Sequence, residues 1–184
     1  MSAGAANLFG LIFLIPIILF MGIPYYLIWP EQFTLVQFKS YFAARDSLTV
    51  FDIVIGFMVL FFGIVTHELL HGLGWSFYAK KGWKSIRFGI EWKYLTPYCH
   101  CAEILPISAY RFGSVLPAIV LGILPSIIAI VSGNLMLMVF GFIFTFAAGG
   151  DFLILWMLRK EKPTVFIQDH PDKIGCLVIQ NPSI

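Results

Sequence analysis

Residues 66–75 read THELLHGLGW and lie within a run of apolar residues that is long enough to cross a membrane. His67, Glu68 and His71 form the pattern H-E-x-x-H. On a helix, positions i and i+4 lie about 40° apart and one turn along the axis, so both imidazoles can reach one metal ion. Glu68 lies at the flank of that face, where its carboxylate can accept a proton from metal-bound water. Zinc suits this chemistry, because it accepts imidazole and carboxylate ligands and keeps a position open for water.

A catalytic zinc site normally has three protein ligands, so a third residue is expected. Asp151 is the remaining ionisable residue within the apolar runs, and such residues at membrane depth are functional candidates. His71 and Asp151 each precede the end of their apolar run by about seven residues, or about 10 Å. Glu103 is an alternative third ligand, because other H-E-x-x-H enzymes use a glutamate from further along the chain. The residues alone leave this choice open.

His100 lies between Cys99 and Cys101, a local grouping of metal-binding residue types. In a strand, alternate side chains point to opposite faces, so the two sulfurs and the imidazole do not share an ion easily. We therefore expect no second metal site there.

The composition predicts an all-α, polytopic membrane protein with one domain over residues 1–184. The chain is 59% hydrophobic and only 12% charged, whereas about a quarter of the residues of a soluble domain are charged. A formal net charge of +2 without a basic run argues against nucleic acid as a partner.

Four transmembrane helices are expected, since a span needs about 20 apolar residues. They are predicted at about 8–29, 53–78, 114–131 and 134–158, with a loop at 79–113 and a tail at 159–184. Only Ser132 and Gly133 separate the third run from the fourth, which predicts a tight antiparallel helical hairpin.

Lysine and arginine residues indicate the orientation. The 79–113 loop carries six of them and the tail four, while the opposite side receives only Lys39 and Arg45. Loops that are rich in lysine and arginine stay in the cytoplasm. Both termini are therefore predicted to be cytoplasmic, in a bacterial inner membrane.

Two regions outside the spans show β character. Apolar and polar residues alternate strictly from Ser85 to Tyr94, Thr96-Pro97 is typical of a turn, and YCHCAEIL is a candidate return strand. This predicts a small hairpin in the cytoplasmic loop. The tail after Pro163 is expected to form two short strands around a polar turn.

The motifs THELLHG, SVLPAIV and AAGGDFLIL resemble the small bacterial membrane family of putative zincin peptidases, from about Phe61 to Leu158. The chain is similar, more distantly, to site-2 proteases, which usually have glycine where this chain has Leu70. The resemblance implies that His67, His71 and Asp151 bind zinc and that Glu68 is the catalytic base.

These observations predict a zinc-dependent, membrane-embedded endopeptidase that hydrolyses membrane or membrane-proximal protein substrates. The alternative is a non-hydrolytic metal-binding membrane protein, acting as a carrier, sensor or scaffold. Glu68 favours the enzyme, because a carrier has no need for a base beside its ligands.

Overall fold

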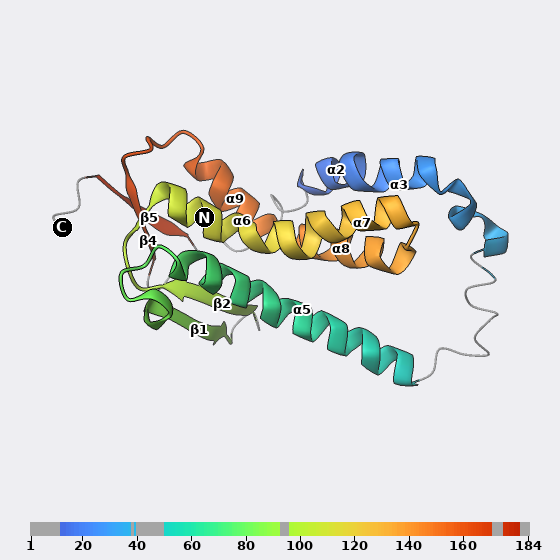
Figure 1. Cartoon of the computed structure of the whole chain (residues 1–184), viewed down its shortest axis with the longest axis horizontal. Helices are drawn as coiled ribbons and strands as arrows, with labels where there is room; N and C mark the ends of the chain where they lie inside the picture. Colours follow the sequence, from blue (N-terminus) through green and yellow to red (C-terminus); the bar gives the residue numbers. More distant parts are fainter. Residues whose placement is uncertain (1–11, 38, 40–49, 93–95, 171–174, 181–184) are drawn as a thin grey trace.

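The computed structural model describes residues 12–37, 39, 50–92, 96–170 and 175–180. Helical segments run back and forth along the long axis, and two small antiparallel sheets lie at one end (Figure 1). The helical segments are α2 (Leu14–Ile17), η1 (Ile18–Gly22), α3 (Ile23–Ile28), η2 (Pro30–Phe33), α5 (Val50–Ser76), η3 (Gly82–Ser85), α6 (Ile107–Pro117), η4 (Ala118–Ile123), α7 (Leu124–Ser132), α8 (Leu135–Ala147) and α9 (Gly149–Leu158).

Among the described residues, two helices are long and apolar enough to cross a membrane, namely Val50–Ser76 and the continuous run Ile107–Ser132. Helices α8 and α9 add a third span if this bent pair is counted as one, and the apolar helix Leu14–Ile28 is shorter. In the most apolar 18-residue stretch of α5, only 11% is buried within the protein. Such a long exposed apolar surface is suited to lipid and not to water.

The third predicted span begins earlier than expected, at Ile107 instead of residue 114, which shortens the preceding loop. The helix therefore includes Arg111, a charged residue that the prediction had placed in the loop. Its guanidinium donates a hydrogen bond to the carbonyl of Leu158 at the end of α9. This bond explains how a charged side chain is accommodated at the start of an apolar helix.

The fourth predicted span is not one straight helix. Helices α8 and α9 meet at Ala148 and are bent by 45°. The bend lets α8 pack against α7 and η4, while α9 packs against α6. Gly133, which has a φ of 71°, ends α7, and Asn134 caps the start of α8 by accepting a hydrogen bond from the backbone N–H of Leu137.

The hairpin between α5 and α6 consists of β1 (Ile86–Glu91) and β2 (Thr96–Cys101), with Ile86 opposite Cys101. The expected turn at Thr96-Pro97 is wrong, because both residues belong to β2 and pair with β1. Tyr94, the expected end of the first strand, lies outside the described residues.

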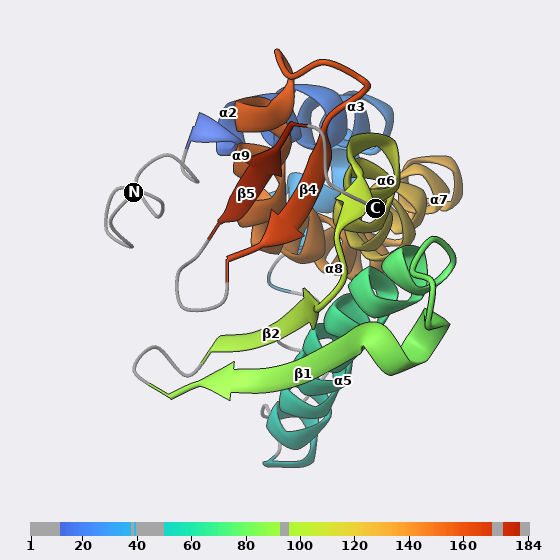
Figure 2. The same ribbon diagram turned by 90° about the vertical axis from the view of Figure 1, so that its left-hand side faces the viewer.

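The tail forms β4 (Phe166–Asp169) and β5 (Cys176–Ile179), and the short strand β3 (Leu105–Pro106) joins β4 in a second sheet. The two sheets lie beside each other at the end of the helices (Figure 2).

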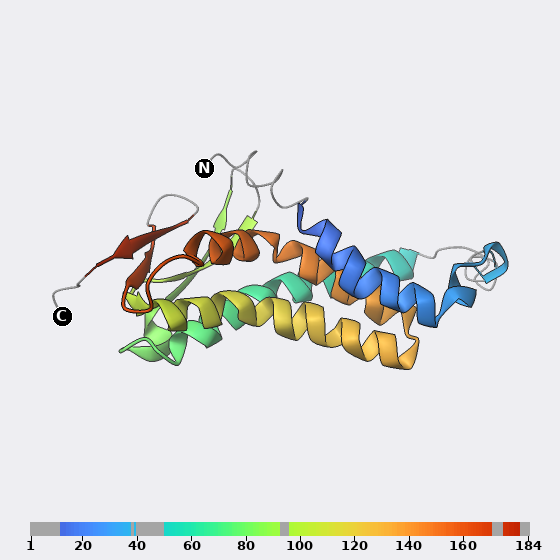
Figure 3. The same ribbon diagram turned by 90° about the horizontal axis from the view of Figure 1, so that it is seen from above.

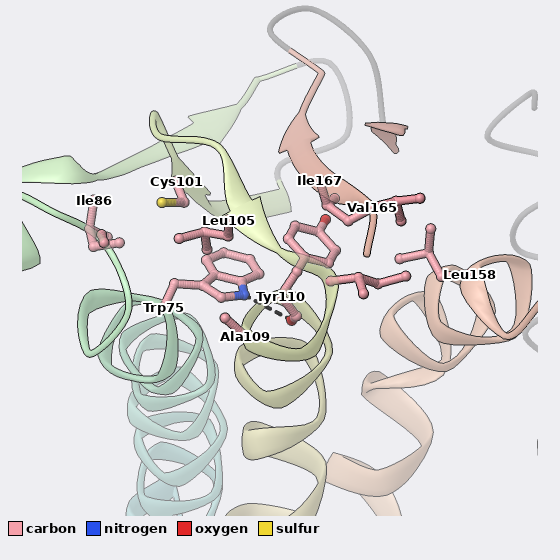
Figure 4. Packing of buried hydrophobic residues seen from close by; sticks show 11 residues of the cluster. Trp75, Ile86, Cys101, Leu105, Ala109, Tyr110, Leu158, Val165 and Ile167 are labelled. Carbon is pink, nitrogen blue, oxygen red and sulfur yellow. Dashed lines mark hydrogen bonds between the residues drawn. The ribbon is translucent and has the colours of Figure 1, made fainter. Parts of the chain in front are cut away.

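Within the described ranges, two clusters of buried residues hold the elements together. At the sheet end, side chains from α5, α6, α9 and β4 pack together, including Trp75, Tyr110, Leu158 and Ile167 (Figure 4). Toward the other end, α2, η1 and α3 lie along α7 and α8 (Figure 3) and bury Ile17, Met21, Tyr25, Ala129 and Met138. The first cluster lies beside the histidines of α5.

Candidate metal centre

Helix α5 places His67 and His71 one turn apart, and both are buried, with exposed fractions of 8% and 5%. Their Nε2 atoms face the carboxylate of Asp151, at 3.2 Å from Oδ2 for His67 and 3.3 Å from Oδ1 for His71. If one ligand atom is taken from each of these three residues, the three atoms all lie within 4.8 Å of one another. The structure therefore brings together the three side chains that the family resemblance implied.

Asp151 reaches this position from the first turn of α9, directly after the bend at Ala148. Gly149 and Gly150 precede Asp151 in the sequence, and such small residues predict close contact with a neighbouring helix. This is wrong for Gly150, where an added Cβ would meet nothing within 4 Å. The bend, and not a glycine contact at residue 150, accounts for the direction in which α9 leaves α8.

The carbonyl of Gly113 in α6 determines the tautomer of His71. The Nδ1 atom of His71 lies 2.9 Å from this oxygen. A carbonyl only accepts hydrogen bonds, so Nδ1 carries the hydrogen and a neutral ring has its lone pair on Nε2. Such a partner for the second ring nitrogen is typical of metal-binding histidines.

The same geometry shows that the centre suits a cation. With Nδ1 protonated, the Nε2 lone pair of a neutral His71 faces an oxygen of Asp151, and both are hydrogen-bond acceptors. Only a positive charge between them, an additional proton or a metal ion, makes this contact favourable. Two imidazole nitrogens and one carboxylate are a ligand set that zinc accepts.

Two glycines bring α5 and α6 close enough for this hydrogen bond. A Cβ on Gly74 would lie 2.7 Å from the Cα of Gly113, and a Cβ on Gly113 would lie 2.1 Å from Cδ1 of Trp75. Neither position has room for a side chain. Neither glycine was predicted from the sequence, although small residues within apolar helices are a known signal of close helix packing.

Glu68 lies at the edge of the centre and is half-buried. Its carboxylate interacts with the charges of His67, His71 and Asp151, and it accepts a hydrogen bond from the backbone N–H of Cys99 in β2. Strand β2 packs closely against α5 here, because a Cβ on Gly72 would lie 3.3 Å from the sulfur of Cys99. Glu68 is thus beside the three potential ligands without being one of them.

Glu103, the alternative third ligand, is engaged elsewhere. Its carboxylate accepts hydrogen bonds from the backbone N–H groups of Lys80, at 2.7 Å, and Lys81, at 2.9 Å, and from the hydroxyl of Ser85. These bonds hold the loop that follows α5. Within the part of the chain that the structure describes, the only grouping suited to a metal ion is that of His67, His71 and Asp151.

The residues around His100 likewise form no metal-binding group in the described part of the chain. The imidazole faces Asp169, with Nδ1 at 3.5 Å from Oδ2. Cys99 and Cys101 are free thiols, and burial raises the pKa of both.

Residues 60–166 match the family described as putative zincin peptidase. The chain belongs to this family. The match runs from the middle of α5 to the start of β4 and includes the H-E-x-x-H motif and Asp151. No curated protein and no solved structure matches the chain. The description of this family agrees with the ligand set and suggests zinc as the metal and a peptidase as the activity.

Proposed function

We propose that the chain is a zinc-dependent endopeptidase, embedded in the membrane, that cleaves peptide bonds of membrane or membrane-proximal proteins. In this proposal His67, His71 and Asp151 hold zinc, and Glu68 is the catalytic base. The observation that carries it is the convergence of two buried Nε2 atoms on the Asp151 carboxylate, with a fourth ionisable group beside them.

When bound, zinc supplies Lewis acidity that makes water acidic enough to lose a proton near neutral pH. The Glu68 carboxylate accepts that proton and donates it to the leaving amine, as a general base and then a general acid. The hydrogen bond from Cys99 holds this carboxylate at the edge of the ligand set. The hydrogen bond to Gly113 keeps the His71 ring oriented toward Asp151.

An apolar groove in the structure supports the proposal that the substrate is membrane-associated. It has a volume of about 420 Å³, and its lining includes Gly63 and Thr66 of α5, Leu121 of η4 and Phe140 of α8. Thr66 is the lining residue of α5 that is nearest to the centre in sequence, and it directly precedes His67. Its apolar lining suits an apolar segment of a substrate better than a soluble polar peptide.

The metal content of detergent-purified protein, measured by mass spectrometry, tests the ligand assignment. We expect one zinc per chain in the wild type and in Glu68→Gln, and much less zinc in Asp151→Ala. An absence of zinc from the wild type, even after incubation with zinc salts, would contradict the proposal.

Cleavage in proteoliposomes tests the role of Glu68. New N-termini that appear in co-reconstituted membrane proteins would be identified by mass spectrometry. We expect Glu68→Gln to reduce their formation by at least about 100-fold, the usual lower range for loss of an acid–base catalyst. A zinc-loaded wild type without cleavage, and with metal transport that Glu68→Gln leaves intact, would favour the non-hydrolytic metal-binding alternative.

A further inference from the structure

The carboxylate of Asp169, in the C-terminal strand β4, connects two elements that hold the metal centre. Its Oδ1 accepts a hydrogen bond from the hydroxyl of Tyr110 in α6, at 2.7 Å. Its Oδ2 accepts one from the backbone N–H of Cys101 in β2, at 2.9 Å. Most of the side chain is shielded from solvent, with 11% of its surface exposed. Asp169 also lies beyond residue 166, where the family match ends.

The first connection leads to His71. The ring of Tyr110 stacks on that of Trp75 at a centroid distance of 5.3 Å, and the indole N–H of Trp75 donates to the carbonyl of Tyr110 at 3.0 Å (Figure 4). Trp75 in turn stacks on the His71 ring, also at 5.3 Å and within 14° of parallel. Gly113, whose carbonyl holds Nδ1 of His71, lies one turn after Tyr110 on the same helix. The position of Tyr110 therefore affects two groups that contact the His71 ring, namely the indole of Trp75 and the carbonyl of Gly113.

The second connection leads to Glu68. Cys101 and Cys99 are two residues apart in β2, so they lie on the same face of the strand. The backbone N–H of Cys99 holds the Glu68 carboxylate, and that of Cys101 is held by Asp169. Fixing Cys101 therefore fixes the part of β2 that faces Glu68.

We propose that Asp169 is a positioning residue of the metal centre. Its carboxylate connects β2, the strand that faces Glu68, to α6, the helix whose Gly113 carbonyl is hydrogen-bonded to His71. The C-terminal hairpin of β4 and β5 is then a part of the site and not only a cover for the buried cluster. The consequences for catalysis and for zinc affinity rest on the proposed function, whereas the consequence for the order of β2 and α6 does not.

Three substitutions separate this role from general stabilisation of the tail. Asp169→Ala removes both hydrogen bonds. Asp169→Asn retains a geometry in which the amide oxygen accepts from Cys101 and the amide nitrogen donates to the hydroxyl of Tyr110. Gln168→Ala is the matched control, because this residue is the neighbour of Asp169 in β4 and points to the opposite face.

Zinc affinity would be measured by competition with a chromophoric chelator. Removing an outer partner of a metal ligand typically weakens metal binding 10- to 100-fold. Because Asp169 acts through intermediate residues, we expect a loss of about tenfold in Asp169→Ala. We expect Asp169→Asn and Gln168→Ala to remain within about twofold of the wild type. If Asp169→Ala also stays within that range, the proposal is wrong.

Hydrogen exchange provides a readout that needs no zinc and no substrate. In Asp169→Ala we expect faster exchange in residues 96–101 and 107–113, and unchanged exchange in α8. Unchanged exchange in the first two segments would overturn the proposal. If Asp169→Ala does not fold, Tyr110→Phe removes only the hydroxyl, and it is expected to show faster exchange in residues 107–113. Failure of cleavage in the wild type would contradict the proposed peptidase activity. The comparisons of zinc affinity and of hydrogen exchange between wild type and variants would remain valid.

Discussion

Single residues at the centre combine a local chemical role with a partner far away in the chain. His71 faces Asp151 with one ring nitrogen and Gly113 with the other. Glu103, in contrast, has the carboxylate expected of a ligand but uses it to bind the loop after α5. At this scale, a residue's type indicates what it can bind, and its hydrogen bonds show what it does bind.

Glu103→Gln tests this assignment through the pH dependence of stability. The hydroxyl of Ser85, followed by the backbone N–H groups of Lys81 and Lys80, holds the pKa of Glu103 below its ordinary value of 4.5. A lowered pKa in the folded state means that the ionised carboxylate stabilises the fold above pH 4.5, and that this contribution is lost as the pH falls through the folded-state pKa. With zinc removed by a chelator, we expect Glu103→Gln to lower the Tm at pH 7, and the difference from wild type to shrink below pH 4.5.

Glu161→Gln, a substitution in the tail, is the matched control for this measurement. The zinc content of Glu103→Gln should equal that of the wild type. A loss of zinc from Glu103→Gln would show instead that Glu103 is a metal ligand.

At the scale of elements, the centre depends on how closely α5 and α6 approach and on where α9 begins. The contact between Gly74 and Gly113 fixes the distance between α5 and α6. The bend at Ala148 fixes the position of the first turn of α9, which carries Asp151. Strand β2 closes the side of the centre where Glu68 lies.

Gly113→Ala is expected to separate α5 from α6. The added methyl group would lie 2.1 Å from Trp75, so the ring or a helix must move. Overpacking of this kind typically costs about 1–3 kcal/mol. We expect a lower free energy of unfolding in detergent, monitored by tryptophan fluorescence, together with weaker zinc binding.

The matched control for this substitution is Gly56→Ala in α5, where an added Cβ meets nothing within 4 Å. It should stabilise the protein slightly, by up to about 1 kcal/mol, because alanine is the better helix former. Equal effects of the two substitutions would contradict the proposed close contact.

The whole molecule is polar at one end. The sheets and the lysine-containing loops that follow α5 and α9 lie together there (Figure 1). Along the helices, many large apolar side chains are exposed. Helix α5 ends at Ser76, five residues after His71, so the centre lies about 8 Å from that end of the helix. We propose that four helical passes cross a bacterial inner membrane with this end in the cytoplasm.

Reporter fusions in a bacterial host test this orientation. A fluorescent protein fused to the C-terminus should fluoresce, and alkaline phosphatase at the same position should be inactive, because phosphatase requires an oxidising compartment. Phosphatase fused after Gln37 should be active, since α2 and α3 would have exported it. The opposite result at both positions would invert the proposed topology.

Local regularities made much of the protein predictable from its sequence. The helical repeat places His67 and His71 on one face, the apolar runs predict helices, and the alternation near Ile86 predicts a strand. The scarcity of ionisable residues in the apolar runs also made Asp151 a candidate ligand. These properties depend on residues that are close together in the chain.

Only the tertiary structure placed Asp151, and not Glu103, beside the two histidines, placed Gly113 against His71, and connected Asp169 to both sides of the centre. The partners are distant in the chain, separated by 84 residues for His67 and Asp151 and by 42 for His71 and Gly113. Their contacts depend on a 45° bend and on close packing between helices. Local propensity and periodicity do not specify such contacts, because many arrangements of the same helices satisfy the same pattern.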